Sequence, residues 1–83
     1  MTREEINKKV TEIIVKKLGV TEGEVTPAAS YVEDLGADSL DQVELVMEFE
    51  DSFSLGEKIP EEEAAKLTTV GSTIEYLVGK LGK

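Results

Sequence analysis

Residues 32–45 read VEDLGADSLDQVEL. The second half of this segment begins an amphipathic helix over about residues 39–53, because its apolar and acidic residues recur at helical spacing. One hydroxyl, that of Ser39, stands at the predicted start of the helix, directly after Asp38. No Lys or Arg occurs in residues 18–57, so Ser39 has no base near it in the sequence. A serine without an adjacent base is a poor nucleophile, but it is a suitable attachment point.

The rest of the chain follows helical rather than strand patterns. An apolar stripe predicts a helix over residues 3–18. Residues 19–38 are long for a structureless connection and predict a packed loop with a short helical turn. A short helix should follow Pro60, and apolar spacing predicts a last helix from about residue 70. The sequence therefore predicts one all-α domain over residues 1–83, a small antiparallel bundle of three main helices and one short helix.

Placing residues 39–53 at steps of 100° divides the predicted helix into two faces. A broad apolar face is predicted to join the core: Val43, Leu45, Val46, Phe49 and Phe53. Four acids cluster within about 80° on the far side: Asp41, Glu44, Glu48 and Asp51. Leu40 and Met47 fall at the border of the acidic stripe, where they predict either the footprint of a partner protein or the edge of the core.

The composition excludes several kinds of chemistry. The chain has no His and no Cys, so it lacks the commonest general base and any thiol nucleophile of its own. No segment has the spacing of acids and glycine that an EF-hand requires, so we expect no metal site. Adjacent acid pairs could in principle exchange protons, but neighbouring residues of a helix diverge, and an enzyme is the weakest hypothesis.

The charge of the chain is unevenly distributed. The net charge is −9, yet residues 18–57 alone hold eleven acids and no base, while the flanks hold nine bases and seven acids. Such a field repels nucleic acid and anionic membranes and attracts proteins with Lys and Arg patches. We expect a cytoplasmic protein, since no signal peptide, transit peptide or membrane-spanning segment is evident, and a monomer, since the net charge opposes self-association.

Ser39 has two interpretations. With Gln42 three residues on, it fits a capping box, in which its hydroxyl would serve only to accept from helix N–H groups. Alternatively, Asp38 caps the helix and leaves the Ser39 hydroxyl free. In the second case, the start of the helix would suit an esterified phosphate.

The chain resembles the acyl carrier proteins of the dissociated bacterial type of fatty-acid synthesis. The resemblance covers nearly the whole chain and is carried by five segments: LGV (18–20), VEDLGADSLD (32–41), VELVM (43–47), IP (59–60) and TVG (69–71). The GADSLD segment is highly specific. The resemblance implies that Ser39 is esterified by 4′-phosphopantetheine, within a motif that includes Asp38 and Leu40.

The resemblance also implies how the chain would work. A separate holo-carrier-protein synthase (a phosphopantetheinyl transferase that uses magnesium) would donate the arm from coenzyme A. The arm would then carry growing acyl chains as thioesters among ketoacyl synthases, reductases, dehydratases and acyltransferases. The chain itself would be a carrier and not an enzyme, and the borrowed thiol fits a sequence without cysteine.

Two sets of residues acquire expected roles from this resemblance. Eight should contact basic patches on partner enzymes: Asp34, Asp38, Leu40, Asp41, Glu44, Met47, Glu48 and Asp51. Six should line a pocket for the acyl chain between the second helix and the short one, with ordinary core packing as the alternative: Val43, Val46, Phe49, Ile59, Ala64 and Leu67.

Some features depart from the family pattern. The Phe53–Ile59 loop is longer than usual, Gln42 stands where Thr is frequent, and Phe49 stands where Leu is frequent. Other carriers of a dedicated pathway (D-alanyl, peptidyl or polyketide type) remain as alternatives. Gly36-Ala37-Asp38 disfavours a peptidyl carrier, in which Gly-Gly commonly precedes the serine. An acidic binding protein that is not a carrier is a more distant hypothesis.

Overall fold

The computed structural model describes residues 2–56 and 58–81. Its helices are α1 (Arg3–Leu18), α2 (Ser39–Ser52), α3 (Glu61–Ala64) and α4 (Val70–Leu81), with a 3-10 turn η1 (Glu22–Glu24) in the loop after α1. Within these ranges there is no strand, only one isolated antiparallel bridge between Ser30 and Thr69. The prediction of an all-α fold with three main helices and one short helix is confirmed.

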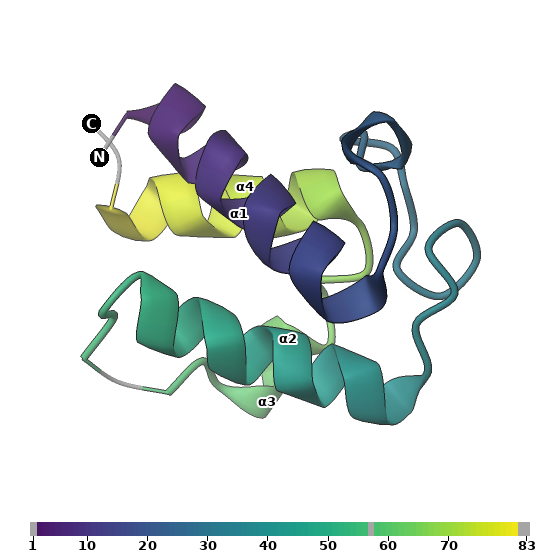
Figure 1. Cartoon of the computed structure of the whole chain (residues 1–83). Helices are drawn as coiled ribbons and strands as arrows, with labels where there is room; N and C mark the ends of the chain where they lie inside the picture. Colours follow the sequence, from purple (N-terminus) through teal and green to yellow (C-terminus); the bar gives the residue numbers. More distant parts are fainter. Residues whose placement is uncertain (1, 57, 82–83) are drawn as a thin grey trace.

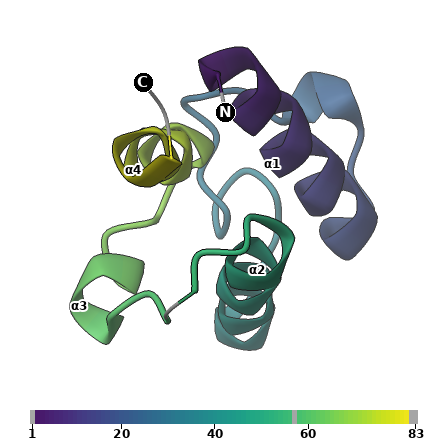
Figure 2. The same ribbon diagram turned by 90° about the vertical axis from the view of Figure 1, so that its left-hand side faces the viewer.

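Helix α1 is the central element of the bundle. It packs against both α2 and α4 and runs opposite to them, while α2 and α4 run in roughly the same direction (Figure 1). Ile6, Val10 and Ile14, spaced four residues apart, are completely buried on its inner face. A view turned by 90° places α3 on the side of α2 and α4 that faces away from α1 (Figure 2).

Helix α2 turns only part of its apolar surface inward. Leu45, Phe49 and Phe53 are at most 5% exposed, but Val43 is 55% exposed. The prediction that Val43 joins the core is therefore wrong. Val43 lies about 120° from Phe49 around the helix, and the described helices cover α2 on too narrow an arc to bury it.

Lys9 of α1 binds the C-terminal end of α2. Its ammonium donates to the Ser52 carbonyl at 2.6 Å and lies 5.2 Å from the centroid of the Phe53 ring. A cation at a helix C-terminus stabilises the unpaired carbonyl groups there, and the ring adds a cation–π contact. Lys9 thus links α1, whose net charge is positive, to α2, whose charged side chains are all acidic.

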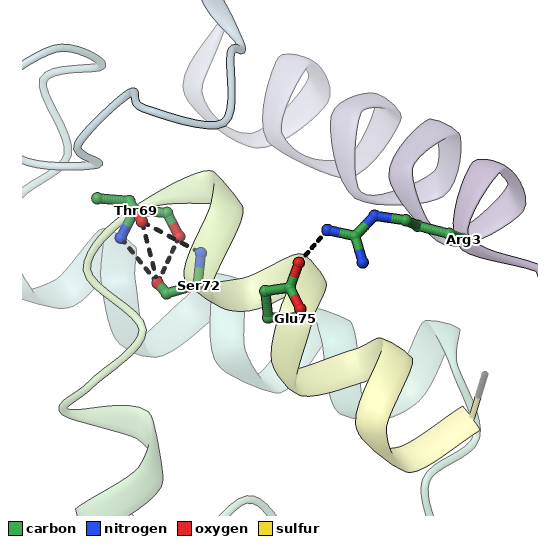
Figure 3. A network of polar contacts seen from close by, with 4 residues as sticks. All are labelled: Arg3, Thr69, Ser72 and Glu75. Carbon is green, nitrogen blue, oxygen red and sulfur yellow. Dashed lines mark hydrogen bonds and ion pairs between the residues drawn. The ribbon is translucent and has the colours of Figure 1, made fainter. Parts of the chain in front are cut away.

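The loop between α1 and α2 is bound to the start of α4 by main-chain hydrogen bonds. Val70 donates to the Ala29 carbonyl at 3.0 Å, and Gly71 donates to the Pro27 carbonyl at 2.9 Å. Thr69 caps α4, because its hydroxyl accepts from the Ser72 N–H at 3.1 Å (Figure 3). Between α1 and α4, Arg3 forms an exposed ion pair with Glu75 (Figure 3). This ion pair contributes little to stability because both groups are solvated.

Two buried hydroxyl groups, of Tyr31 and Thr73, also join the loop to α4. The Thr73 hydroxyl donates to the Thr69 carbonyl at 3.2 Å, so it accepts the hydrogen bond from the Tyr31 hydroxyl. Tyr31 is 2% exposed, and burial raises the pKa of its phenol to about 12, a shift that the contact with Thr73 partly opposes. Tyr31 therefore stays neutral at physiological pH and acts as a hydrogen-bond donor.

Gly71→Ala should destabilise the fold, because a Cβ at this position would lie 2.8 Å from the Pro27 carbonyl oxygen. Overpacking of this kind costs about 1–3 kcal/mol. Gly79→Ala is the matched control in the same helix, since its Cβ would meet nothing within 4 Å. It should stabilise the fold by up to about 1 kcal/mol through helix propensity. Urea unfolding of both variants measures the difference; equal stabilities would contradict the close contact.

Tyr31→Phe should remove an alkaline loss of stability. The folded-state pKa lies above the unfolded value, so the unfolded chain loses its proton first as the pH rises above about 10. The wild type should then lose roughly 1.4 kcal/mol for each pKa unit of difference between pH 10 and 12. Urea unfolding across this range measures the loss for the wild type and for the variant. Tyr76→Phe keeps Tyr31 and should retain the loss; a Tyr31→Phe curve that matches it would refute the assignment.

Candidate functional site

The loop before α2 holds its last residues in a defined position. Leu35 and Ala37 are buried, and the Ala37 N–H donates to the Tyr31 carbonyl at 2.8 Å. Gly36 between them has φ 73°, a left-handed conformation that glycine adopts without strain. The carboxylate of Asp34 accepts from the Ser30 N–H at 2.7 Å and closes the preceding turn. These contacts fix the point at which the chain enters α2.

Asp38, and not Ser39, caps α2. The Asp38 carboxylate accepts from the Asp41 N–H at 2.9 Å, and the Asp41 carboxylate accepts from the Asp38 N–H at 3.2 Å. This reciprocal pair is a capping box. The hypothesis of a box between Ser39 and Gln42 is therefore wrong, and the alternative, in which Asp38 releases the serine, is the arrangement found.

Ser39 is the first residue of α2, and its side chain is exposed. Among the described residues, its hydroxyl has no hydrogen-bond partner. The main-chain N–H groups of Ser39 and Leu40 lie in the first turn of α2, where N–H groups have no partner within the helix. A phosphodiester on this oxygen would meet unpaired N–H donors and the positive end of the helix dipole, so these residues fit such a group.

The acids around this site differ in their exposure and in their hydrogen bonds. Glu44 and Asp51 are exposed and form no hydrogen bond or ion pair through their side chains within the described chain. Asp41 is half-buried in the cap. Glu48 is half-buried as well. Its carboxylate accepts from the Ser52 hydroxyl at 3.3 Å and lies 3.8 Å from the Lys17 ammonium. The acidic face predicted from spacing thus has a solvent-facing edge and an edge held by α1.

Three apolar side chains lie in the open beside these acids. Leu40 is 64% exposed, Val43 55% and Met47 58%, and they follow one another at three- and four-residue spacing along α2. The possibility that Leu40 and Met47 mark the edge of the core is therefore wrong. Val43, which was assigned to the core and the acyl pocket, belongs to this exposed strip instead.

A cavity of about 20 Å³ lies beside α2, along its residues 42–49. Its lining comes from the loop, α2, α4 and the segment of α3: Tyr31, Gln42, Leu45, Val46, Phe49, Ala64, Leu67 and Thr73. A space of this size holds about one water molecule, so its walls would have to separate to admit an acyl chain.

The structure brings together four of the six residues predicted for the acyl pocket: Val46, Phe49, Ala64 and Leu67. Val43 is exposed, and Ile59 is buried in a different hollow of about 70 Å³ against Tyr76 and Leu81. The Ile59 N–H donates to the Glu50 carboxylate at 2.7 Å, which holds Ile59 at the far end of α2.

The sequence prediction missed the remaining lining residues of the cavity: Tyr31, Gln42, Leu45 and Thr73. Gln42 was detectable, because it lies between Leu45 and Val46 around the helix. Tyr31 and Thr73 come from a loop and from another helix, and no local spacing relates them to α2. Across the described ranges, no group of three or more candidate ligands could hold a metal ion. None of the described helices is long and apolar enough to cross a membrane.

Comparison with known proteins agrees with this geometry. Residues 8–77 match the family model described as a phosphopantetheine attachment site. An acyl carrier protein of Rubrobacter xylanophilus is 58% identical over 78 residues, which cover 94% of each chain. A solved structure of acyl carrier protein from Enterococcus faecalis superposes with a TM-score of 0.78 and 39% identity over 96% of this chain and 99% of that one. The chain therefore belongs to the acyl carrier protein family, whose members carry acyl groups on 4′-phosphopantetheine.

Proposed function

We propose that Ser39 is the attachment point of the 4′-phosphopantetheine arm, and that the chain carries growing acyl chains among the enzymes of fatty-acid synthesis. The observation that supports this proposal most strongly is that Asp38, and not Ser39, caps the start of α2. Asp38 satisfies the helix terminus, while the exposed Ser39 hydroxyl is left without a partner in the described structure. When bound, the arm supplies the thiol that this cysteine-free chain lacks.

The residues around Ser39 contribute position and charge. The capping box holds the backbone of the first turn of α2, so a transferase meets the Ser39 side chain at a fixed position. The nearby carboxylates of Asp38 and Asp41 repel the phosphate of the arm. The N–H groups in the first turn of α2 offset this repulsion. A transferase must therefore neutralise the acids while it delivers the phosphate.

Partner enzymes would dock on α2. The exposed acids Glu44 and Asp51 attract basic patches, and the strip of Leu40, Val43 and Met47 adds apolar contact beside them. Charge steering of this kind gives fast and salt-sensitive encounters, which suit a carrier that must also leave each enzyme. The partners proposed are the phosphopantetheinyl transferase and then ketoacyl synthases, reductases, dehydratases and acyltransferases. Action in the cytoplasm, as a monomer, stays a prediction.

A dedicated pathway is the alternative within the same family. D-alanyl, peptidyl and polyketide carriers would use the same attachment point. The acidic face of α2 favours bulk fatty-acid synthesis, because many different enzymes must recognise one surface by a shared charge pattern.

Ser39→Ala should fold normally yet gain no mass on incubation with coenzyme A and a broad-specificity transferase. The hydroxyl makes no contact within the described residues, so the change in unfolding free energy should stay within about 0.5 kcal/mol. Ser54→Ala, at an exposed position outside the helices, is the matched control and should be loaded like the wild type. Intact-mass analysis measures loading; a Ser39→Ala chain that gains the arm would place attachment elsewhere.

Glu44→Lys should slow loading by the transferase roughly tenfold at low ionic strength, because it reverses the charge of one of the two exposed acids of α2. The difference from the wild type should shrink as salt is added. Glu12→Lys makes the same charge change at an exposed position of α1 and should have little effect. Initial rates from mass spectrometry test this expectation, and equal slowing of both variants would argue for net charge instead of a docking surface.

A further inference from the structure

Met47 carries the one thioether among the residues that the structure describes, and this side chain lies in the open. Met47 is 58% exposed, and it takes no part in the buried core of the bundle. The sulfur of an exposed methionine is readily oxidised to a sulfoxide, whereas packing shields a buried one. Because the core does not include Met47, a chemical change of its side chain leaves the packing of the fold intact.

The position of Met47 on α2 connects its sulfur with docking. Met47 lies about 160° around the helix from both Leu45 and Phe49, which are buried, so it faces away from the core. Leu40, seven residues earlier, lies only about 20° from Met47 on the same exposed face. A partner protein that docks on this face would therefore cover the sulfur.

The charges around the sulfur determine which oxidants reach it. Glu44 and Asp51 stand three residues before and four residues after Met47, and their exposed carboxylates pair with no other described residue. The surrounding segment, residues 18–57, holds eleven acids and no base. This negative field repels anionic oxidants and has no net effect on a neutral one. The site is thus open to a neutral peroxide.

We propose that Met47 is a site of reversible oxidation, at which hydrogen peroxide converts the thioether to a sulfoxide and thereby weakens docking on α2. This inference rests on the proposed function, of which docking on α2 is a part. The sulfur attacks one oxygen of the peroxide, and the O–O bond breaks. The departing hydroxide takes the proton from the transferred oxygen and leaves as water. Sulfur is oxidised and the peroxide is reduced in the same step.

The sulfoxide changes the apolar strip of α2 without changing its acids. Its oxygen is a polar acceptor, which must lose water when a partner covers it, and this loss costs free energy unless the partner donates a hydrogen bond. The strip of Leu40, Val43 and Met47 then keeps two apolar side chains of three. A methionine sulfoxide reductase reverses the change, because it reduces the sulfoxide with a dithiol and yields the thioether, a disulfide and water.

The test compares wild type with Met47→Leu, which keeps Met1 and every other oxidisable group. Both chains are treated with hydrogen peroxide, freed of it by gel filtration, and incubated with coenzyme A and the transferase. Peptide mass mapping locates the added oxygen, and intact mass gives the initial loading rate, divided by the rate of the same protein without treatment. Oxidised wild type should load roughly fivefold more slowly, the effect of one buried polar group without a partner. Met47→Leu should not respond to peroxide, whatever its own untreated rate.

Two further readouts separate weaker docking from damage to the fold. The melting temperature of oxidised wild type should equal that of the untreated protein, since Met47 lies outside the core. Incubation with the reductase and a dithiol should restore the loading rate. A lower melting temperature would mean that the slower loading comes from unfolding and would refute the proposal.

The charge of the oxidant gives an independent test. Oxidation of Met47 by hydrogen peroxide should not depend on salt, whereas oxidation by peroxymonosulfate, an anion, should speed up several-fold as salt screens the acids. Glu44→Gln combined with Asp51→Asn removes the two nearest exposed charges and should reduce this salt dependence. An equal salt response of both oxidants would overturn the role assigned to the field.

The outcomes distinguish this inference from the proposed function. If untreated wild type gains no arm, the proposed function of Ser39 fails. If it is loaded normally but peroxide leaves Met47 unchanged, the oxidation site is overturned. If Met47 is oxidised and loading keeps its rate, or if Met47→Leu is slowed equally, the effect on docking is overturned. Loading that the reductase does not restore would refute reversibility.

Discussion

The structure depends on the main-chain contact between the long loop and the start of α4. Gly71 and Pro27 approach closely enough to exclude a Cβ, and the adjacent hydrogen bonds of Ala29 and Tyr31 extend the contact. This contact fixes a loop that has no regular secondary structure beyond η1. It thereby positions Tyr31 in the core and Ala37 at the entrance to α2. The position of Ser39 therefore depends on a contact made more than thirty residues away in the sequence.

Opposite charges are separated across the same bundle. Lys9 and Lys17 of α1 reach the end and the inner edge of α2, where they pair with the Ser52 carbonyl and with Glu48. The outer edge of α2 holds exposed apolar side chains and acids that pair with no other described residue. One helix therefore serves the core, the pairing with α1 and the proposed docking surface on three successive arcs. This arrangement explains why a carrier can be held firmly and still offer a highly charged surface to its partners.

Much of this was predictable because it is local. The bounds of α1 followed from apolar spacing, and those of α2 were predicted to within one residue. The acids of α2 were found from the helical step alone. The errors arose where a neighbouring element decides. Val43 satisfies the apolar pattern of α2, but α1 and α4 do not reach around to cover it. Ile59 was assigned by its place in the sequence, yet its bond to Glu50 takes it to another hollow.

The sequence by itself determined the fold class, the segment proposed for attachment and the sign of the field around it, because each depends on residue types a few positions apart. It left open whether Ser39 or Asp38 caps α2, and the geometry of the capping box resolved that choice. Only the tertiary structure placed Tyr31 and Thr73 in one cavity, since these residues lie forty-two positions apart and share no periodicity. Local spacing sets which face of a helix is apolar, whereas burial and hydrogen bonding across the bundle set what that face surrounds.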